Sequence, residues 1–131
     1  MRALWGKCCM RNWIILVLAS GLLTACQEDI RIDGFESQKW KADPNGCNGD
    51  RKKLMHLLLS NQKILIGRSE MDIKALLGKP DSQDLQTRGQ MFFEYGTVGN
   101  SLCDQASSLS PTILRIRFDA LDRVTEIAIY E

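Results

Sequence analysis

Histidine is nearly absent from this sequence, which contains only His56 among its 131 residues. No acid–base partner for it can be identified nearby, and the chain has no nucleophile motif or metal-ligand spacing. Hydrolases and metalloenzymes usually depend on such groups. Two carboxylate pairs, Asp81 with Asp84 and Asp119 with Asp122, lie beside turn sequences, where aspartate is common for conformational reasons. We therefore expect no enzyme, no catalytic residue and no metal site.

The sequence also lacks a long apolar run and an excess of charge of either sign. The apolar stretch at residues 13–23 is too short to cross a bilayer, which needs about 20 apolar residues. The 17 basic residues are balanced by 16 acidic ones, so no electrostatic basis for nucleic-acid binding exists. No repeat or low-complexity tract occurs, and the length fits one domain.

The N-terminus resembles the signal peptide of a bacterial lipoprotein. Three basic residues precede the apolar stretch 13–23, which has the length of a signal-peptide h-region. The stretch ends in Leu23, Thr24, Ala25 and Cys26, which together resemble a lipobox. The resemblance implies cleavage before Cys26, a diacylglycerol group on its thiol and an acyl chain on its new N-terminus. We expect no other cofactor.

The lipobox also predicts where the chain is located. Three acyl chains on Cys26 would hold the protein firmly to a membrane, because two such signals already give stable anchoring. In many Gram-negative bacteria, Asp directly after the lipidated cysteine retains a lipoprotein in the inner membrane. Gln27 holds that position here, which favours the periplasmic side of the outer membrane. The alternative is a short N-terminal transmembrane helix, although the chain becomes polar directly after Cys26.

Cysteine usage predicts one disulfide bond. Cys8 and Cys9 would leave with the signal peptide, and Cys26 would be lipidated. Cys47 and Cys103 then remain in an oxidising compartment, so we expect them to form a disulfide. Two alternatives stay open at this point. The pair could be metal ligands, although the spacing makes a poor zinc set, or two unpaired thiols.

The chain divides into a signal peptide (1–25), a lipidated tether (26–45) and one folded domain (46–131). The tether is polar and contains turn signals such as Pro44 before Asn45. Phe35 and Trp40 interrupt it, and we expect them to pin the tether onto the core of the domain. The alternative is an aromatic pair that contacts the membrane or a partner.

Two helices are expected at the start of the domain. The first covers residues 48–63, with Asn48 as its N-cap and a stripe of leucines on one face. The run 51–53 is basic, and we interpret it as a solvated face. Contact with anionic lipid headgroups or an acidic partner is the alternative.

The second helix lies between Ser69 and Pro80. Ser69 and Asp72 form a capping-box pattern, Gly78 ends the helix, and Pro80 prevents its continuation.

Beyond Pro80 the apolar period changes from 3.6 to 2, which is typical of strands. Strands are expected near residues 82–87, 91–95, 113–118 and 124–130. On the last strand, Thr125, Ile127 and Ile129 should share one face. Arg115 and Arg117 should project away from the helices or lie under a partner. The predicted fold is α+β: two N-terminal helices packed on a three- to four-stranded antiparallel sheet, as a two-layer sandwich.

Residues 61–130 resemble the SmpA/OmlA (BamE-like) family of outer-membrane lipoproteins. The resemblance rests on the helix end Leu76-Leu77-Gly78-Lys79-Pro80, the strand Phe92-Phe93-Glu94-Tyr95, and the hairpin segments Leu114-Arg115-Ile116-Arg117-Phe118-Asp119 and Arg123-Val124-Thr125. It implies a BamE-like or β-lactamase-inhibitor-like scaffold, but it carries over no functional residue. The segment 40–53 and the cysteine pair depart from the family pattern.

The expected function is that of a lipid-anchored binding or scaffold lipoprotein of the cell envelope. Its membrane contact would be the lipid anchor, and its protein partner would belong to the envelope. The family resemblance implies an accessory role in outer-membrane β-barrel protein assembly. The alternative is a periplasm-facing inhibitor or ligand-binding lipoprotein on the same fold, with residues 96–110 as its binding loop.

Overall fold

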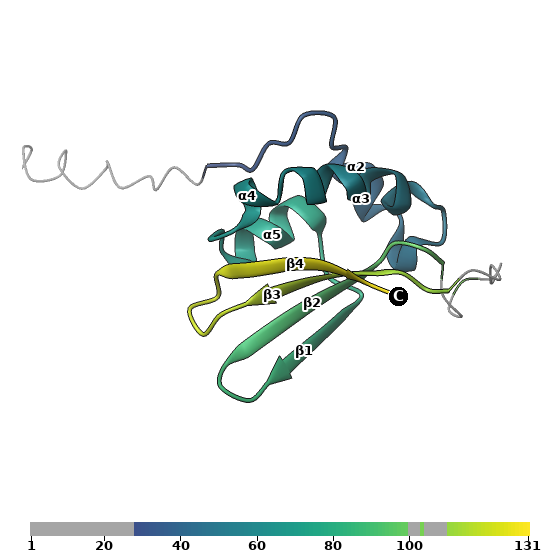
Figure 1. Cartoon of the computed structure of the whole chain (residues 1–131). Helices are drawn as coiled ribbons and strands as arrows, with labels where there is room; N and C mark the ends of the chain where they lie inside the picture. The colour runs from purple at the N-terminus through teal and green to yellow at the C-terminus, as the bar shows by residue number, and fades with distance from the viewer. Residues whose placement is uncertain (1–27, 100–102, 104–109) are drawn as a thin grey trace, which may run out of the picture.

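The structure is a computed structural model, which describes residues 28–99, 103 and 110–131. The predicted signal peptide, the residues Leu23, Thr24 and Ala25, and the lipidation position Cys26 lie outside the described residues. The described chain has the expected α+β architecture, with helices stacked on one face of an antiparallel sheet (Figure 1).

Helical segments come first along the chain and strands follow. The helical segments are α2 (Ser37–Lys41), the 3-10 helix η1 (Pro44–Gly46), α3 (Asp50–Ser60), α4 (Gln62–Leu65) and α5 (Glu70–Leu77). The strands are β1 (Ser82–Gln86), β2 (Gln90–Gly96), β3 (Ile113–Phe118) and β4 (Val124–Tyr130). Each strand pairs antiparallel with its neighbour in sequence, so the sheet order is β1-β2-β3-β4.

Helix α5 begins and ends where its sequence signals predict. The Ser69 hydroxyl accepts a hydrogen bond from the Asp72 amide at 3.2 Å, and the Ser69 amide donates to the Asp72 carboxylate at 3.0 Å. This reciprocal pair satisfies two amides that a helix start leaves unpaired. Gly78, with φ of 77°, then takes a backbone conformation that disfavours other residues.

Helix α3 differs from the prediction at both ends. Its N-cap is Gly49 rather than Asn48, and the Asp43 carboxylate satisfies the nearby amides. That carboxylate accepts from the amides of Asn48 at 2.7 Å and Arg51 at 3.0 Å. At the other end, Asn61 has φ of −110° and ψ of 20°, which separates α3 from the short α4. The local sequence at the start of α3 does not reveal this cap, because Asp43 lies before the turn that precedes the helix.

Strands β2 and β3 alternate as predicted, whereas β1 is exposed at every position and β4 contains a bulge. In β3 every second side chain is buried, and Arg88 and Gly89 form the β1–β2 turn with positive φ. In β4, Val124 pairs with Phe118 and Glu126 pairs with Arg117, which leaves Thr125 as an extra residue. Val124 and Ile127 are therefore the buried residues of β4. Ile127 and Ile129 share one face as expected, because they pair with the buried Ile116 and Leu114, but Val124 rather than Thr125 shares it with them.

The folded domain extends further toward the N-terminus than the sequence suggests. Trp40 and Asp43 are fully buried, and Ile32 is 7% exposed, although the tether was expected to reach residue 45. The Trp40 ring centroid lies 5.7 Å from that of Phe35 and 6.0 Å from that of Tyr95. Both aromatic residues therefore pin this segment onto the core. Helix α2 has only five residues, too few to show a helical period in the sequence.

Candidate binding surface

One face of the sheet is not covered by any of the described helices (Figure 1). We call it the open sheet face. Its register places Glu94 of β2 beside Arg115 of β3, and Arg117 of β3 beside Glu126 of β4. Arg115 and Arg117 thus point away from the helices, as expected from the alternation in β3.

Arg115 is held on the open sheet face by two hydrogen bonds and two aromatic rings. Its Nε and one terminal nitrogen donate to Glu94 Oε1 at 2.9 Å and 2.6 Å. The centre of its guanidinium lies 5.6 Å from the Phe92 ring centroid and 4.4 Å from that of Tyr130, within the range of cation–π attraction. The hydrogen bond to Glu94 raises the pKa of Arg115, so the group stays charged.

Arg117 adds a second cation to the same face. Its guanidinium lies 3.3 Å from Glu126 across the strand pair. Its Nε is buried and has no hydrogen-bond partner within the described residues. The open sheet face therefore combines aromatic rings, held arginines and carboxylates.

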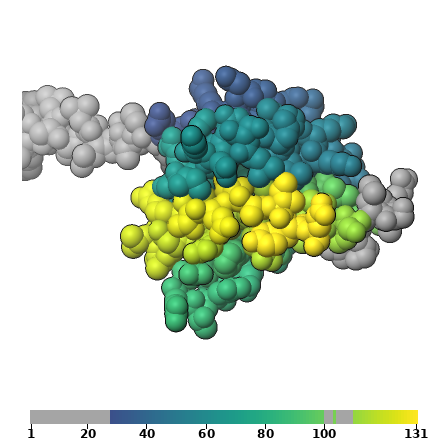
Figure 2. Space-filling view, in the orientation of Figure 1, coloured from purple at the N-terminus to yellow at the C-terminus, as the bar shows by residue number. Residues whose placement is uncertain are grey.

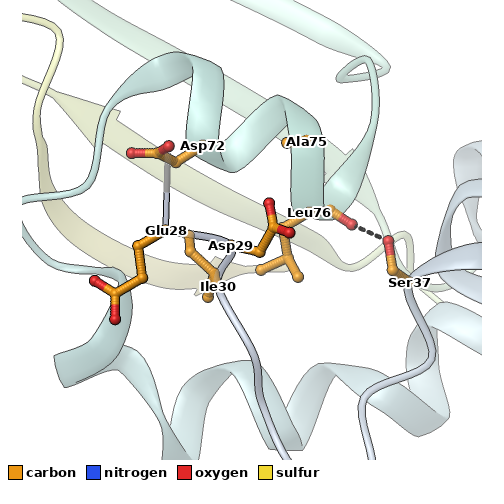
Figure 3. A pocket seen from close by; sticks show the side chains of 7 residues that line it. All are labelled: Glu28, Asp29, Ile30, Ser37, Asp72, Ala75 and Leu76. Carbon is orange, nitrogen blue, oxygen red and sulfur yellow. Dashed lines mark hydrogen bonds between the residues drawn. The ribbon is translucent and has the colours of Figure 1, made fainter. Parts of the chain in front are cut away.

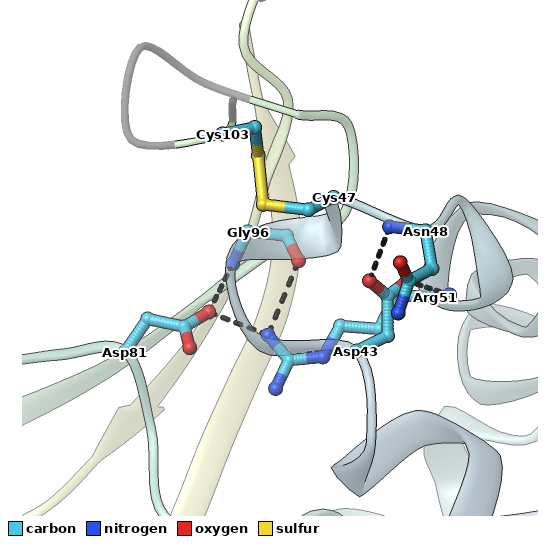
Figure 4. Close-up of a disulfide and its surroundings, with 7 residues drawn as sticks. All are labelled: Asp43, Cys47, Asn48, Arg51, Asp81, Gly96 and Cys103. Carbon is cyan, nitrogen blue, oxygen red and sulfur yellow. Dashed lines mark hydrogen bonds and ion pairs between the residues drawn. A yellow bond between two sulfur atoms is a disulfide. The ribbon is translucent and has the colours of Figure 1, made fainter. Parts of the chain in front are cut away.

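A second arginine cluster lies inside the molecule, around Arg51 of α3 (Figure 4). Arg51 pairs with Asp81 and donates to the carbonyl oxygens of Trp40 at 3.0 Å and Gly96 at 3.2 Å. Its side chain is only 2% exposed. The expectation that residues 51–53 form a solvated basic face is therefore wrong for Arg51. Helical spacing could have predicted the burial of Arg51, because it lies seven residues before the buried Leu58 and therefore on the same helix face.

The predicted disulfide lies beside this cluster and joins Cys47 to Cys103 with Cα atoms 5.5 Å apart (Figure 4). It attaches the segment after β2 to the turn before α3. The backbones are in close contact here, since a Cβ on Gly46 would lie 2.5 Å from the Thr97 carbonyl carbon. The disulfide and Arg51 thus hold the same junction. The expected binding loop 96–110 lies largely outside the described residues.

A shallow hollow of about 210 Å³ lies where the first described residues cross α5 (Figure 3). Glu28, Asp29 and Ile30 form one wall of the hollow, and residues of α5 form the other. The Ser37 hydroxyl donates to the Leu76 carbonyl oxygen at one edge. The hollow is open, and carboxylates lie on both of its walls, because Asp72 of α5 faces Glu28 and Asp29 across it.

The four aspartates noted in the sequence have structural partners or exposed positions. Asp81 accepts hydrogen bonds from Arg51 and the Gly96 amide, and Asp119 accepts from the amides of Leu121 and Arg123. Asp122 has a positive φ in the same turn, and Asp84 lies on the exposed strand β1. Asp119 and Asp122 lie in one turn, where the Asp122 amide donates to the Asp119 carbonyl oxygen at 3.1 Å. In the described ranges, no group of three or more His, Cys, Asp or Glu residues could hold a metal ion.

Comparison with known proteins gives no identification. No family model, curated protein or solved structure matches this chain. Among the described helices, none is long and apolar enough to span a membrane. The interpretation of the surface rests on its geometry and on the sequence.

Proposed function

We propose that this chain is a lipid-anchored protein of the bacterial envelope, which binds a protein partner through the open sheet face. The observation that carries the proposal is the Arg115 cluster, which lies on a sheet face that no described helix covers. Arginine and aromatic residues are enriched at the energetic centres of protein interfaces. The anchor itself is an inference from the lipobox at Cys26.

The cluster suits binding because its parts are already held in place. Glu94, Phe92 and Tyr130 fix the Arg115 guanidinium, so a partner would lose little side-chain entropy on contact. Tyr130 is 44% exposed, which leaves one side of its ring available. A prearranged arginine between two rings offers both apolar area and hydrogen-bond donors.

We propose that the partner belongs to the machinery that assembles β-barrel proteins in the outer membrane. The sequence resemblance to the SmpA/OmlA family supports this role, and a helical layer on an antiparallel sheet is compatible with a BamE-like scaffold. The position of Gln27 after Cys26 supports outer-membrane sorting on the periplasmic side.

The first test is the intact mass of the membrane-extracted protein beside a Cys26→Ala variant. We expect a triacylated N-terminus at Cys26 and loss of the membrane-bound form in the variant. A chain that keeps residues 1–25 and carries no lipid would contradict the anchor.

The second test identifies the partner by photo-crosslinking from Tyr130 in intact cells. Arg115→Ala should weaken the recovered complex by roughly tenfold or more, as expected for an interface centre. Lys53→Ala is the matched control, because Lys53 is an exposed cation on α3, away from the open sheet face. Equal losses in both variants would contradict the assignment. Capture of a soluble periplasmic enzyme would favour an inhibitor over an assembly factor.

A further inference from the structure

The described chain begins against α4 and the linker that follows it. A carboxylate oxygen of Glu28 lies 3.8 Å from the Arg68 guanidinium. Residues 28–31 line a hollow of about 470 Å³ together with Ile64 and Arg68. Cys26 is two residues before Glu28, and an extended chain spans at most about 3.6 Å per residue. A lipid on Cys26 would therefore be attached within about 7 Å of Glu28.

Exposed apolar side chains gather at this same end of the molecule. Gly67 donates to the Val124 carbonyl oxygen at 2.8 Å, and Glu70 donates to that of Asp122 at 3.0 Å. These bonds join the α4–α5 linker to the β3–β4 turn. Four side chains on α4, this linker, the first turn of α5 and the β3–β4 turn are 39–78% exposed: Ile64, Ile66, Met71 and Leu121. We call these four residues the anchor-proximal surface.

The space-filling view shows this arrangement from outside (Figure 2). The teal helical segments and the yellow end of the sheet meet beside the start of the described chain. Leu121 and Met71 are the most exposed of the four, at 78% and 70%. Arg68 and Arg123 lie in the same segments and supply two cations there, Arg68 beside Glu28 and Arg123 beside the Gly67 carbonyl oxygen.

We propose that the anchor-proximal surface rests on the bilayer that holds the Cys26 acyl chains. This inference depends on the lipid anchor of the proposed function. The lipid on Cys26 and the apolar surface beside it would make two membrane contacts. Together they would fix the orientation of the domain on the bilayer, which the lipid alone would leave free. Isoleucine, leucine and methionine would enter the interfacial layer, and the arginines would lie at the headgroups.

The proposal also predicts which part of the molecule stays in water. Glu131 directly follows β4. The seven residues of this strand extend about 20 Å from Val124 to Tyr130, at about 3.3 Å per residue. Lys52 and Ile129 line a hollow with Glu131 at that distant end. This end should therefore face the periplasm. The edges of the sheet should not point into the membrane.

The test uses the mature, lipidated protein in vesicles of phosphatidylethanolamine and phosphatidylglycerol. An environment-sensitive fluorophore is attached to Ile66→Cys, Leu121→Cys or the distant control Glu131→Cys. The Cys47–Cys103 disulfide and the lipidated Cys26 leave the introduced thiol as the labelling position. An intact disulfide and an unchanged circular dichroism spectrum would show that each variant is folded. We expect each variant to fold, because the substituted positions are exposed.

We expect a blue shift and strong quenching by spin-labelled lipids at positions 66 and 121, but not at 131. A lipidated protein whose labels at 66 and 121 stay as water-exposed as the label at 131 would overturn this inference alone. Equal quenching at all three positions would also overturn it, because no particular surface would then face the bilayer. A mature chain without lipid would overturn the anchor, and this inference with it.

Discussion

Two arginines of this domain have the same kind of surroundings but different exposure. Arg51 lies 5.3 Å and 5.5 Å from two ring centroids and pairs with Asp81. Arg115 lies 5.6 Å and 4.4 Å from two ring centroids and pairs with Glu94. The Arg51 side chain is 2% exposed, whereas that of Arg115 is 35% exposed.

The difference in exposure changes what each arrangement does. A charge buried as deeply as Arg51 destabilises the fold if its partner is lost, because no water can replace that partner. A charge as exposed as Arg115 contributes little to stability, because water competes with Glu94 for its hydrogen bonds. The buried cluster therefore maintains the fold, whereas the exposed cluster is available to a partner.

Loss of the buried carboxylate should have the largest effect. Asp81→Ala would leave Arg51 uncompensated, and the free energy of unfolding should fall by about 3–5 kcal/mol in urea denaturation. The matched variant Glu94→Ala should cost no more than about 1 kcal/mol, since its arginine can be hydrated. Similar losses in the two variants would show that exposure does not separate the two clusters.

Removal of the disulfide should have the next largest effect. Its cysteines are 56 residues apart, and the chain-entropy model gives about 4 kcal/mol for a loop of that size. The double variant Cys47→Ser with Cys103→Ser should show this loss in thermal or urea unfolding without leaving a lone thiol. Partner binding through Arg115 should persist below the unfolding temperature. Loss of binding in the still-folded variant would instead connect the disulfide junction to the open sheet face.

Removal of a tyrosine hydroxyl from the Arg51 cluster or from the Arg115 cluster should give a smaller difference in the free energy of unfolding. The Tyr95 hydroxyl donates to the Gly78 carbonyl oxygen at 2.9 Å, so Tyr95→Phe should cost about 1 kcal/mol. Tyr130→Phe should change stability by less, because Tyr130 is exposed. Both variants can be compared with the parent protein by urea unfolding at neutral pH.

The same pair should differ in alkaline solution. Burial raises the pKa of Tyr95 above its ordinary value of 10.0. Below that pH the phenol is neutral in both folded and unfolded chains, so its contribution is fully present. As the pH rises further, the unfolded chain loses this proton first, and stability falls. This part of the alkaline loss should disappear in Tyr95→Phe and persist in Tyr130→Phe.

Arg115→Ala should have the smallest effect on stability. We expect a change below about 1 kcal/mol in urea unfolding, because an exposed ion pair contributes little. The same variant should nevertheless weaken partner binding, as argued above. A large stability loss with unchanged binding would assign the cluster to the fold rather than to an interface.

The sequence was sufficient for features that depend on local chemistry. The capping box at Ser69 and the alternation in β3 both have a local signature. The Cys47–Cys103 pairing followed from elimination and is present in the structure.

Features that depend on distant partners could not be predicted in this way. Trp40 and Asp43 lie in a polar segment, and their burial depends on packing against β2 and α3. The bulge at Thr125 depends on how β4 pairs with β3. The Arg115 cluster was expected only as a basic face. Its rings come from two other strands, and register alone brings them together.

The junction between the N-terminal helices and β2 also constrains the order of folding. Each strand pairs with its neighbour in sequence, so the sheet can form from local contacts. Trp40 and Arg51, by contrast, need Tyr95, Asp81 and Gly96 before they can be buried. If the chain is exported as proposed, with its N-terminus first, Trp40 would stay in water until residue 96 had crossed the inner membrane. We expect nascent chains that end before β2 to remain unfolded and to require a holding chaperone in the periplasm.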